Sequence, residues 1–140
     1  MGYTNIVGLD ASPEMLEEAK AKDAYVELVE RFLCIPEGIP DSLKNRFEGV
    51  TAAGVLFLGY MGAEVFDEML EMLKPGGYAS FTSREDLHIK MGYHDKIEKL
   101  VEEGKWEHIS TADFIKFQHA ADELTRFHSM PAKHYVYKKL

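Results

Sequence analysis

The chain has 140 residues, with 16 Lys and Arg against 24 Asp and Glu, and its net charge is −8. Hydrophobic residues make up 46% and charged residues 29%, a balance that excludes a disordered tail and predicts one folded domain over residues 1–140. The single cysteine, Cys34, excludes an intramolecular disulfide and any metal site built from several cysteines.

The first predicted element is a buried strand over residues 5–10, which ends in the carboxylate of Asp10. A helix is expected to follow at once, because Ser12 can cap it and Pro13 suits its first position. This helix is predicted to end near Asp23. Its inward stripe is predicted to consist of Met15, Leu16 and Ala19.

The next elements follow the same alternation. Residues 25–29 are rich in β-forming side chains and predict a second strand. Residues 50–57 form the most apolar segment and predict a central strand, with a glycine-flanked turn at residues 59–62. Apolar residues at helical spacing predict a helix over residues 63–73.

The sequence Lys74-Pro75-Gly76-Gly77 is expected to stop this helix with a turn. A strand is predicted at residues 78–82, a helix at residues 94–103, and two antiparallel strands at residues 106–110 and 134–137. The periodicity of residues 111–130 does not distinguish helix from loop. The order of elements predicts an α/β fold with a largely parallel sheet and an antiparallel strand pair at its C-terminal end.

Ligands of open α/β sheets bind beyond the carboxyl ends of the strands, and three such ends hold candidate residues. Asp10 is placed to accept hydrogen bonds from two ribose hydroxyls, or it serves only the positive end of the next helix. The segment at residues 59–62 suits a small-molecule cleft, or is a plain turn. Arg84, beside Glu85 and Asp86, would orient a polar substrate, or belongs to a solvated cluster.

Other chemistry has little support in the sequence. The six histidines show no metal-ligand spacing and are interpreted as scattered surface imidazoles, so no metal site is predicted. No serine has the surroundings of an activated nucleophile, and Cys34 has no histidine near it in sequence, so no catalytic residue is assigned. Neither of the glycine-rich motifs GxGxxG and GxxxxGK[ST] occurs in the chain.

The charge is uneven along the chain. Residues 1–87 carry 7 basic and 16 acidic side chains, whereas residues 88–140 carry 9 and 8. The acidic part repels phosphate backbones, so we expect no nucleic-acid partner. The N-terminus shows no signal-peptide pattern, and the longest uncharged run, at residues 49–63, is short for a membrane span. We therefore expect a soluble, cytoplasmic protein that does not enter a membrane.

Three sequence motifs in this chain resemble the motifs of a known family. The runs GLDASPEML at residues 8–16, LKPGG at residues 73–77 and SFTSRE at residues 80–85 resemble class I S-adenosylmethionine-dependent methyltransferases. Residues 93–106 look like the Williams–Beuren syndrome region methyltransferase-like group within that superfamily. The resemblance implies a Rossmann-like sheet of seven strands in the order 3-2-1-4-5-7-6, with S-adenosylmethionine as the cofactor.

The resemblance also implies roles for individual residues. Asp10 would hold the ribose hydroxyls of the cofactor, and Ala11 and Phe32 would lie against its adenine. Gly59 would border the methionine moiety. The residues that would line the substrate side are Tyr60, Met61, Arg84 and Glu85.

One departure from the family is large. The chain begins at what resembles the second strand, so the first strand and its glycine-rich DxGxGxG loop are missing, and we expect an N-terminally truncated member. The flanking strands would then pair directly, or a second copy would complete them by swapping, or the chain would fold poorly. A homodimer through exposed strand edges is therefore expected.

Two functions follow from the sequence. The first is a methyltransferase that transfers a methyl group by direct displacement to an unidentified small-molecule or protein acceptor. The second is a non-catalytic interaction or scaffold protein derived from a methyltransferase fold, which the missing loop favours. A nucleotide-binding dehydrogenase ranks third, because it too needs a glycine-rich loop.

Overall fold

The computed structural model describes residues 2–116 and 130–140. The chain divides into two compact units, Met1–Pro36 and Glu37–Leu140, and each is described by itself. The single domain expected over residues 1–140 stays a prediction. In the described part of the chain, no helix has the length and apolar character needed to span a membrane.

The N-terminal unit is a strand-helix-strand motif. Strands β1 (Val7–Asp10) and β2 (Glu27–Glu30) pair in parallel, and helix α1 (Pro13–Ala21) connects them. The predicted helix start is confirmed, because the backbone N–H of Met15 donates to Oγ of Ser12 at 3.2 Å and Pro13 opens the helix.

The predicted inward stripe of α1 is wrong at one position. Leu16 and Ala19 are half-buried, but Met15 is 57% exposed, and no residue of α1 is fully buried. A nine-residue helix on a two-stranded sheet has too little apolar surface beneath it to cover a wider stripe.

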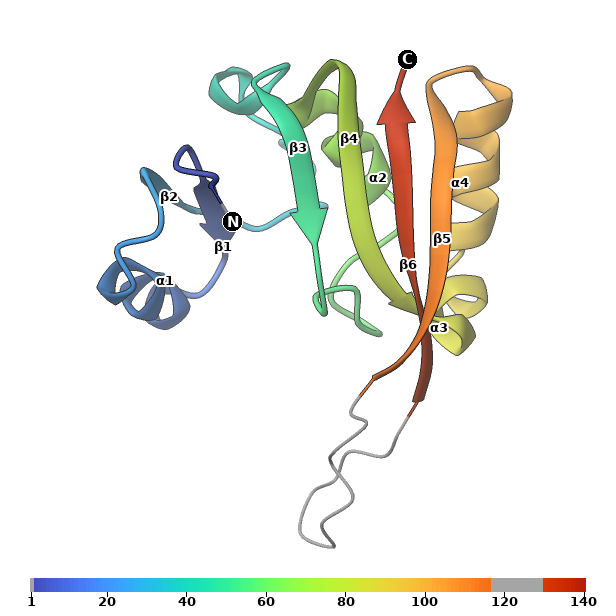
Figure 1. The fold of residues 1–140 in the computed structure, drawn as a ribbon, viewed down its shortest axis with the longest axis horizontal. Coiled ribbons are helices and arrows are strands. Elements are labelled where there is room, and N and C mark those ends of the chain that lie inside the picture. Colours follow the sequence, from blue (N-terminus) through green and yellow to red (C-terminus); the bar gives the residue numbers. More distant parts are fainter. Residues whose placement is uncertain (1, 117–129) are drawn as a thin grey trace, which may run out of the picture. The chain divides into compact units, whose positions relative to one another are not determined.

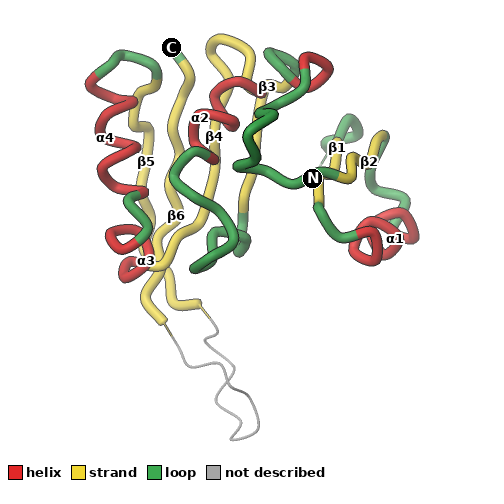
Figure 2. Tube along the Cα trace, turned by 180° about the vertical axis from the view of Figure 1, so that it is seen from behind, coloured by secondary structure: helices red, strands yellow, loops and turns green. Residues whose placement is uncertain are grey.

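The C-terminal unit is a four-stranded sheet with helices on one face (Figures 1 and 2). The sheet has the order β3-β4-β6-β5, in which β3 and β4 are parallel and the remaining pairs are antiparallel. This confirms the predicted α/β class and the antiparallel C-terminal pair. The elements in chain order are η1 (Asp41–Leu43), β3 (Phe47–Ala52), α2 (Val65–Met72), β4 (Leu73–Arg84), α3 (Glu85–Lys90), α4 (Tyr93–Glu102), β5 (Trp106–Lys116) and β6 (Met130–Lys139).

Aromatic rings form the core between the helices and the sheet. The ring of Phe66 on α2 lies 5.0 Å from Phe81 on β4, 5.3 Å from Tyr93 on α4 and 6.0 Å from Trp106 on β5, measured between centroids. All four side chains are at most 1% exposed. This cluster fixes two helices on the sheet, because each ring fills space between different elements.

Lys139 on β6 caps the C-terminal end of α2 with hydrogen bonds. Nζ of Lys139 donates to the backbone oxygens of Leu70 and Leu73, each at 2.7 Å, and to Oδ1 of Asn45 at 3.0 Å. An ammonium group at this position satisfies carbonyls that the helix itself leaves unpaired and complements the helix dipole.

The strand order agrees with the order that the family resemblance implies. If β1 and β2 correspond to the second and third family strands, the two-stranded sheet is the 3-2 part and the four-stranded sheet is the 4-5-7-6 part. Among the described strands, β1 has β2 as its sheet neighbour and β3 has β4. Both β1 and β3 are therefore edge strands of their described sheets.

Some predicted boundaries are wrong, and glycine geometry explains one of them. The strand expected over residues 50–57 spans Phe47–Ala52 instead. Gly54 has a φ of +72°, which ends the extended backbone, and its N–H donates to Oγ1 of Thr82 at 2.9 Å. The predicted turn at residues 74–77 lies within β4 and interrupts its pairing with β3. Phe47 of β3 pairs with Leu73, whereas Gly49 pairs with Tyr78, so the extra residues of β4 bulge out between the two pairs.

The sequence also left two segments without an assigned structure. Residues 85–90 form helix α3, which was not predicted. Of the ambiguous residues 111–130, the first six extend β5 and Met130 begins β6. The apolar landmarks Phe117 and Phe127 lie outside the described residues.

Gly77 provides a test of the β3–β4 pairing. A Cβ atom on Gly77 would lie 3.0 Å from the backbone oxygens of Glu48 and Lys74. We expect Gly77→Ala to lower the free energy of unfolding by about 1–3 kcal/mol in chemical denaturation, because backbone atoms must move apart. Gly49→Ala is the matched control, since its Cβ would have no neighbour closer than 3.8 Å. Equal effects of the two substitutions would contradict this packing.

Candidate functional site

The carboxyl edge of the two-stranded sheet holds three of the predicted cofactor residues. Asp10 ends β1 and is half-buried, and its Oδ1 accepts a hydrogen bond from the N–H of Ser12 at 2.9 Å. Its backbone oxygen accepts from the N–H of Arg31 at 2.9 Å. These bonds fix the carboxylate beside the start of α1 and hold the segment after β2 next to it.

The two apolar candidates lie on the same edge. Ala11 directly follows Asp10 and is half-buried, whereas Phe32 comes two residues after Glu30, the register partner of Asp10, and is 66% exposed. The structure therefore brings a carboxylate and an exposed aromatic ring to the ends of neighbouring parallel strands. Such an edge can take a group that has hydroxyls on one side and a flat apolar ring on the other.

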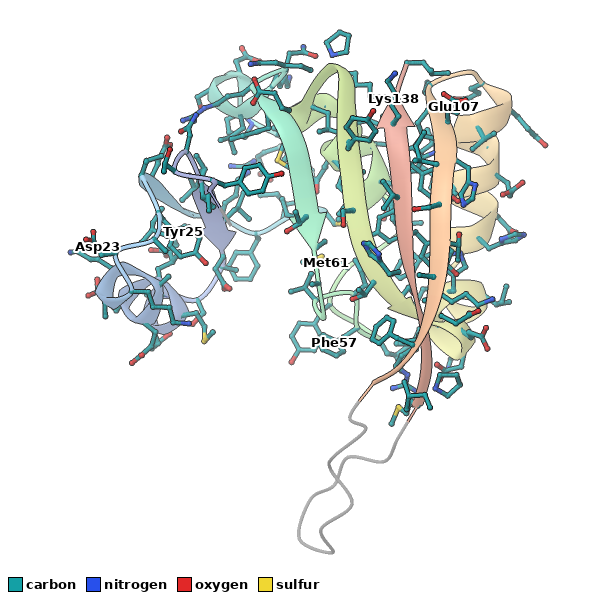
Figure 3. The ribbon with its side chains drawn as sticks, in the orientation of Figure 1. Asp23, Tyr25, Phe57, Met61, Glu107 and Lys138 are labelled. Atoms are coloured by element: carbon teal, nitrogen blue, oxygen red, sulfur yellow. The ribbon has the colours of Figure 1, made fainter. Side chains whose placement is uncertain are left out.

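In the C-terminal unit, the connection from β3 to α2 forms the predicted turn. Gly59 has a φ of +81°, a backbone conformation that favours glycine, and Tyr60 is 82% exposed. The backbone oxygen of Met61 accepts a hydrogen bond from the hydroxyl of Tyr93 at 2.7 Å, which anchors the turn to α4. Phe57 and Met61 both project from the segment that follows β3 (Figure 3).

The ends of β3 and β4 enclose only a small space. The cavity there is about 10 Å³, which is the size of a single water site, so it cannot hold an organic ligand. The residues around it are Gly54, Leu56, Thr82, Ser83, Arg84, Phe114 and Ala132. Thr82, near the end of β4, was not among the predicted site residues, and its Oγ1 accepts a hydrogen bond from the N–H of Gly54 at 2.9 Å.

The two charged candidates at the end of β4 have partners within the protein. Arg84 binds Asp86 in a two-pronged ion pair, with Nε–Oδ1 and Nη2–Oδ2 distances of 2.9 and 2.5 Å. The hydrogen bond from Arg84 is the main cause that lowers the pKa of Asp86 below its ordinary value. Glu85 pairs with Lys133 on β6 at 3.0 Å. Both candidates therefore take part in partly exposed ion pairs, which agrees with the alternative of a solvated cluster.

One histidine was misinterpreted at the sequence level. His88, one turn along α3 from Glu85, is only 7% exposed, so the expectation of surface imidazoles is wrong for this residue. Burial is the main cause that lowers the pKa of His88 to about 4, and the positive charges of His94 and Lys133 add to the shift. His88 is therefore uncharged at neutral pH. In the described residues, no group of three or more metal-ligating side chains comes together.

Comparisons with known proteins identify the family. A family model described as "Methyltransferase domain" matches residues 1–81. Methyltransferase-like protein 27 of Homo sapiens is 32% identical over 111 residues, which cover 76% of this chain and 43% of that protein. An uncharacterised methyltransferase of Emericella nidulans is 33% identical over 101 residues, which cover 62% of this chain and 34% of that protein. The chain thus spans less than half the length of either relative.

Solved structures show the same fold. A putative S-adenosylmethionine dependent methyltransferase from Listeria monocytogenes has a TM-score of 0.68 at 13% identity, covering 99% of this chain and 82% of that one. The N-methyltransferase NodS from Bradyrhizobium japonicum, in complex with S-adenosylhomocysteine, has a TM-score of 0.65 at 17% identity, covering 96% and 66%. The chain belongs to the methyltransferase domain family, and the resemblance to class I S-adenosylmethionine-dependent methyltransferases is confirmed.

The buried imidazole of His88 predicts a pH dependence of stability. Because its pKa is lowered from 6.5 to about 4, the folded chain binds this proton more weakly than the unfolded chain does. Its contribution is fully present above pH 6.5 and is lost as the pH falls toward 4, by about 1–3 kcal/mol in total. Denaturant titrations across this range should show a weaker pH dependence in His88→Phe than in the unsubstituted chain. Parallel curves for the two proteins would contradict the assignment.

Proposed function

We propose that this chain is a methyltransferase domain that binds S-adenosylmethionine at the carboxyl edge of β1 and β2. The observation that supports the proposal best is the position of Asp10, which ends a parallel strand, directly precedes a capped helix and lies within the region matched by the family model. A carboxylate at this place of an α/β fold suits the two hydroxyls of a ribose.

The neighbouring residues fit the rest of the nucleoside. Ala11 and the exposed ring of Phe32 offer an apolar surface for an adenine on the same edge as Asp10. Gly59, in the turn after β3, would border the methionine part, because nothing lies within 4 Å of the position of a Cβ there. S-adenosylmethionine supplies an electrophilic methyl group when it is bound.

Four residues are proposed for the acceptor side: Tyr60, Met61, Arg84 and Glu85. Tyr60 presents its exposed phenol ring, and Met61 lies in a turn that Tyr93 anchors. Arg84 pairs with Asp86 and Glu85 pairs with Lys133, and both would orient a polar acceptor. Transfer by direct displacement needs positioning and exclusion of water, so these residues would act by orientation. The acceptor is a small molecule or a protein, and we assign no general base.

The 140 residues contain no DxGxGxG motif. The donor contacts proposed for these residues are therefore those of Asp10, Ala11, Phe32 and Gly59. We expect no nucleic-acid partner, because the net charge of the chain is −8. We also propose a cytoplasmic location, since a single cysteine suits a reducing compartment.

A second candidate function rests on the strand edges. Both β1 and β3 are edge strands in the described sheets, and such edges pair readily with other strands. We propose as the alternative a non-catalytic interaction protein that forms a homodimer through these edges. The two functions differ in whether the donor binds.

The ribose role of Asp10 can be measured directly. In calorimetry with S-adenosylhomocysteine, Asp10→Asn should weaken binding about tenfold or more, because the substitution removes the charge that strengthens hydrogen bonds from hydroxyls. The Asn side chain can still accept the bond from Ser12, so the local fold is kept. The control is Asp23→Asn, which makes the same chemical change between α1 and β2, before the start of β2.

Two results would contradict donor binding as proposed. If a demonstrably folded chain gives no heat at millimolar ligand, the donor does not bind and the interaction function is favoured. If Asp10→Asn and Asp23→Asn bind with the affinity of the unsubstituted chain, the ligand is held elsewhere.

The homodimer can be tested by sedimentation velocity over an about hundredfold range of concentration, where association shows mass-action dependence. A lysine on an edge strand disfavours pairing, so Thr51→Lys in β3 should shift the population toward monomer. Ser42→Lys, in η1 and outside the sheet, should leave the distribution unchanged. A monomer at every concentration would refute edge pairing.

A further inference from the structure

The connection between β3 and α2 exposes several apolar side chains within one short segment. We call residues 55–60 the apolar turn, and its exposed members are Val55, Phe57, Leu58 and Tyr60. Leu58 is 52% exposed and Tyr60 is 82% exposed. Surface turns usually carry glycine, proline or small polar residues, which fit the backbone or bond with water. Large apolar side chains gathered in such a turn therefore mark a binding surface.

The backbone of the turn directs these side chains outward. The N–H of Tyr60 donates to the backbone oxygen of Phe57 at 3.3 Å, and Gly59 has the positive φ that a type II turn requires of its third residue. The rings of Phe57 and Tyr60 meet edge-on, with a centroid distance of 6.5 Å. Phe114 on β5 adjoins the start of the segment, because Phe114 and Leu56 line the same small cavity. Three partly exposed rings therefore border this side of the unit.

The apolar turn carries no charge that could pair with a ligand. Residues 49–63 contain no Asp, Glu, Lys or Arg. The first charged group after them is the carboxylate of Glu64, which lies against Gly62. A ligand with a negative charge would lose hydration on these apolar rings and meet a like charge beside them.

The cations at the neighbouring end of β4 also have partners. Arg84 pairs with Asp86, and Lys133 pairs with Glu85. An anionic ligand would have to displace one of these carboxylates to reach a cation. The surroundings of the apolar turn therefore disfavour an anion.

The size of this surface favours a small molecule over a protein. The apolar turn spans only residues 55–60, whereas a stable protein interface takes roughly 20–30 residues from each partner. The cavity at the adjoining strand ends is about 10 Å³, so an organic ligand must lie on the rings and not between the strands. Exposed aromatic rings hold another planar ring by stacked or edge-on contact.

We propose that the apolar turn binds the body of the methyl acceptor, and that this acceptor is a small aromatic molecule without a negative charge. The inference rests on the proposed function, in which Tyr60 and Met61 belong to the acceptor side. It narrows the acceptor from a small molecule or a protein to one chemical class. The apolar turn lies wholly within the unit Glu37–Leu140, so its binding of an aromatic ring needs no methyl donor.

Three probes with similar carbon skeletons separate aromaticity from charge. Naphthol is aromatic and uncharged at neutral pH, naphthoate is aromatic and anionic, and decalol is the saturated counterpart of naphthol. Each is titrated into the full 140-residue chain without methyl donor, and the side-chain signals of the apolar turn are followed by NMR. Naphthol should produce saturable shifts of the Leu58 and Tyr60 signals. Naphthoate and decalol should each bind about three- to tenfold more weakly, as expected for a disfavoured charge and for lost ring contacts.

Two variants locate the binding. Tyr60→Ser removes the most exposed ring of the turn and should weaken naphthol binding about three- to tenfold. Leu58→Asn replaces an apolar side chain by a residue that is usual in turns, and should weaken binding about threefold or more. Both side chains are more than half exposed, so the fold is kept. The matched control is Tyr3→Ser, which makes the same change at a tyrosine of the unit Met1–Pro36 that is 79% exposed.

The proposal is overturned if the folded chain shows no saturable shift with naphthol, or if Tyr60→Ser and Tyr3→Ser bind naphthol equally well. Naphthoate that binds as tightly as naphthol would refute the exclusion of anions, and decalol that does so would refute an aromatic acceptor. An acceptor binds beside the donor, so naphthol should bind equally well when S-adenosylhomocysteine is present, and competition between the two would refute the acceptor role.

Failure of this inference is distinguishable from failure of the proposed function. If calorimetry shows donor binding that depends on Asp10 while naphthol does not bind, only the acceptor class is refuted. If naphthol binds and the donor does not, the role of the apolar turn as an acceptor site is refuted together with the methyltransferase function.

Discussion

The structure of the C-terminal unit depends on one ring, that of Phe66. It is fully buried and packs against rings from β4, α4 and β5, so that a single side chain of α2 connects the helical layer to the sheet. Tyr93, one of these rings, also holds the turn after β3 through the backbone of Met61. Packing in the core and the geometry of the proposed acceptor side are therefore parts of the same arrangement.

Local signals in the sequence predicted much of the fold. Ser12 and Pro13 determine a helix start through capping and a fixed φ, which depend on neighbouring residues alone. The burial of His88 could not be predicted in this way, because it results from packing between elements far apart in sequence. The neighbourhood of His108 and Tyr137 likewise follows from their register, which is known only once β5 and β6 are paired.

The residues proposed for the methyl donor and acceptor are distributed over both units. Asp10, Ala11 and Phe32 belong to Met1–Pro36, whereas the residues proposed for the methionine part and the acceptor belong to Glu37–Leu140. Substitutions in one unit therefore test one part of the proposal without changing the residues proposed for the other part.

The position of β6 has a consequence for how the sheet forms. The strands β4 and β5 are consecutive in the chain, yet β6, which follows both, lies between them in the described sheet. Each of the two therefore keeps an open edge until β6 is inserted, and only this step closes the four-stranded sheet. Long-range pairing of this kind slows folding and exposes strand edges to other chains before it is complete.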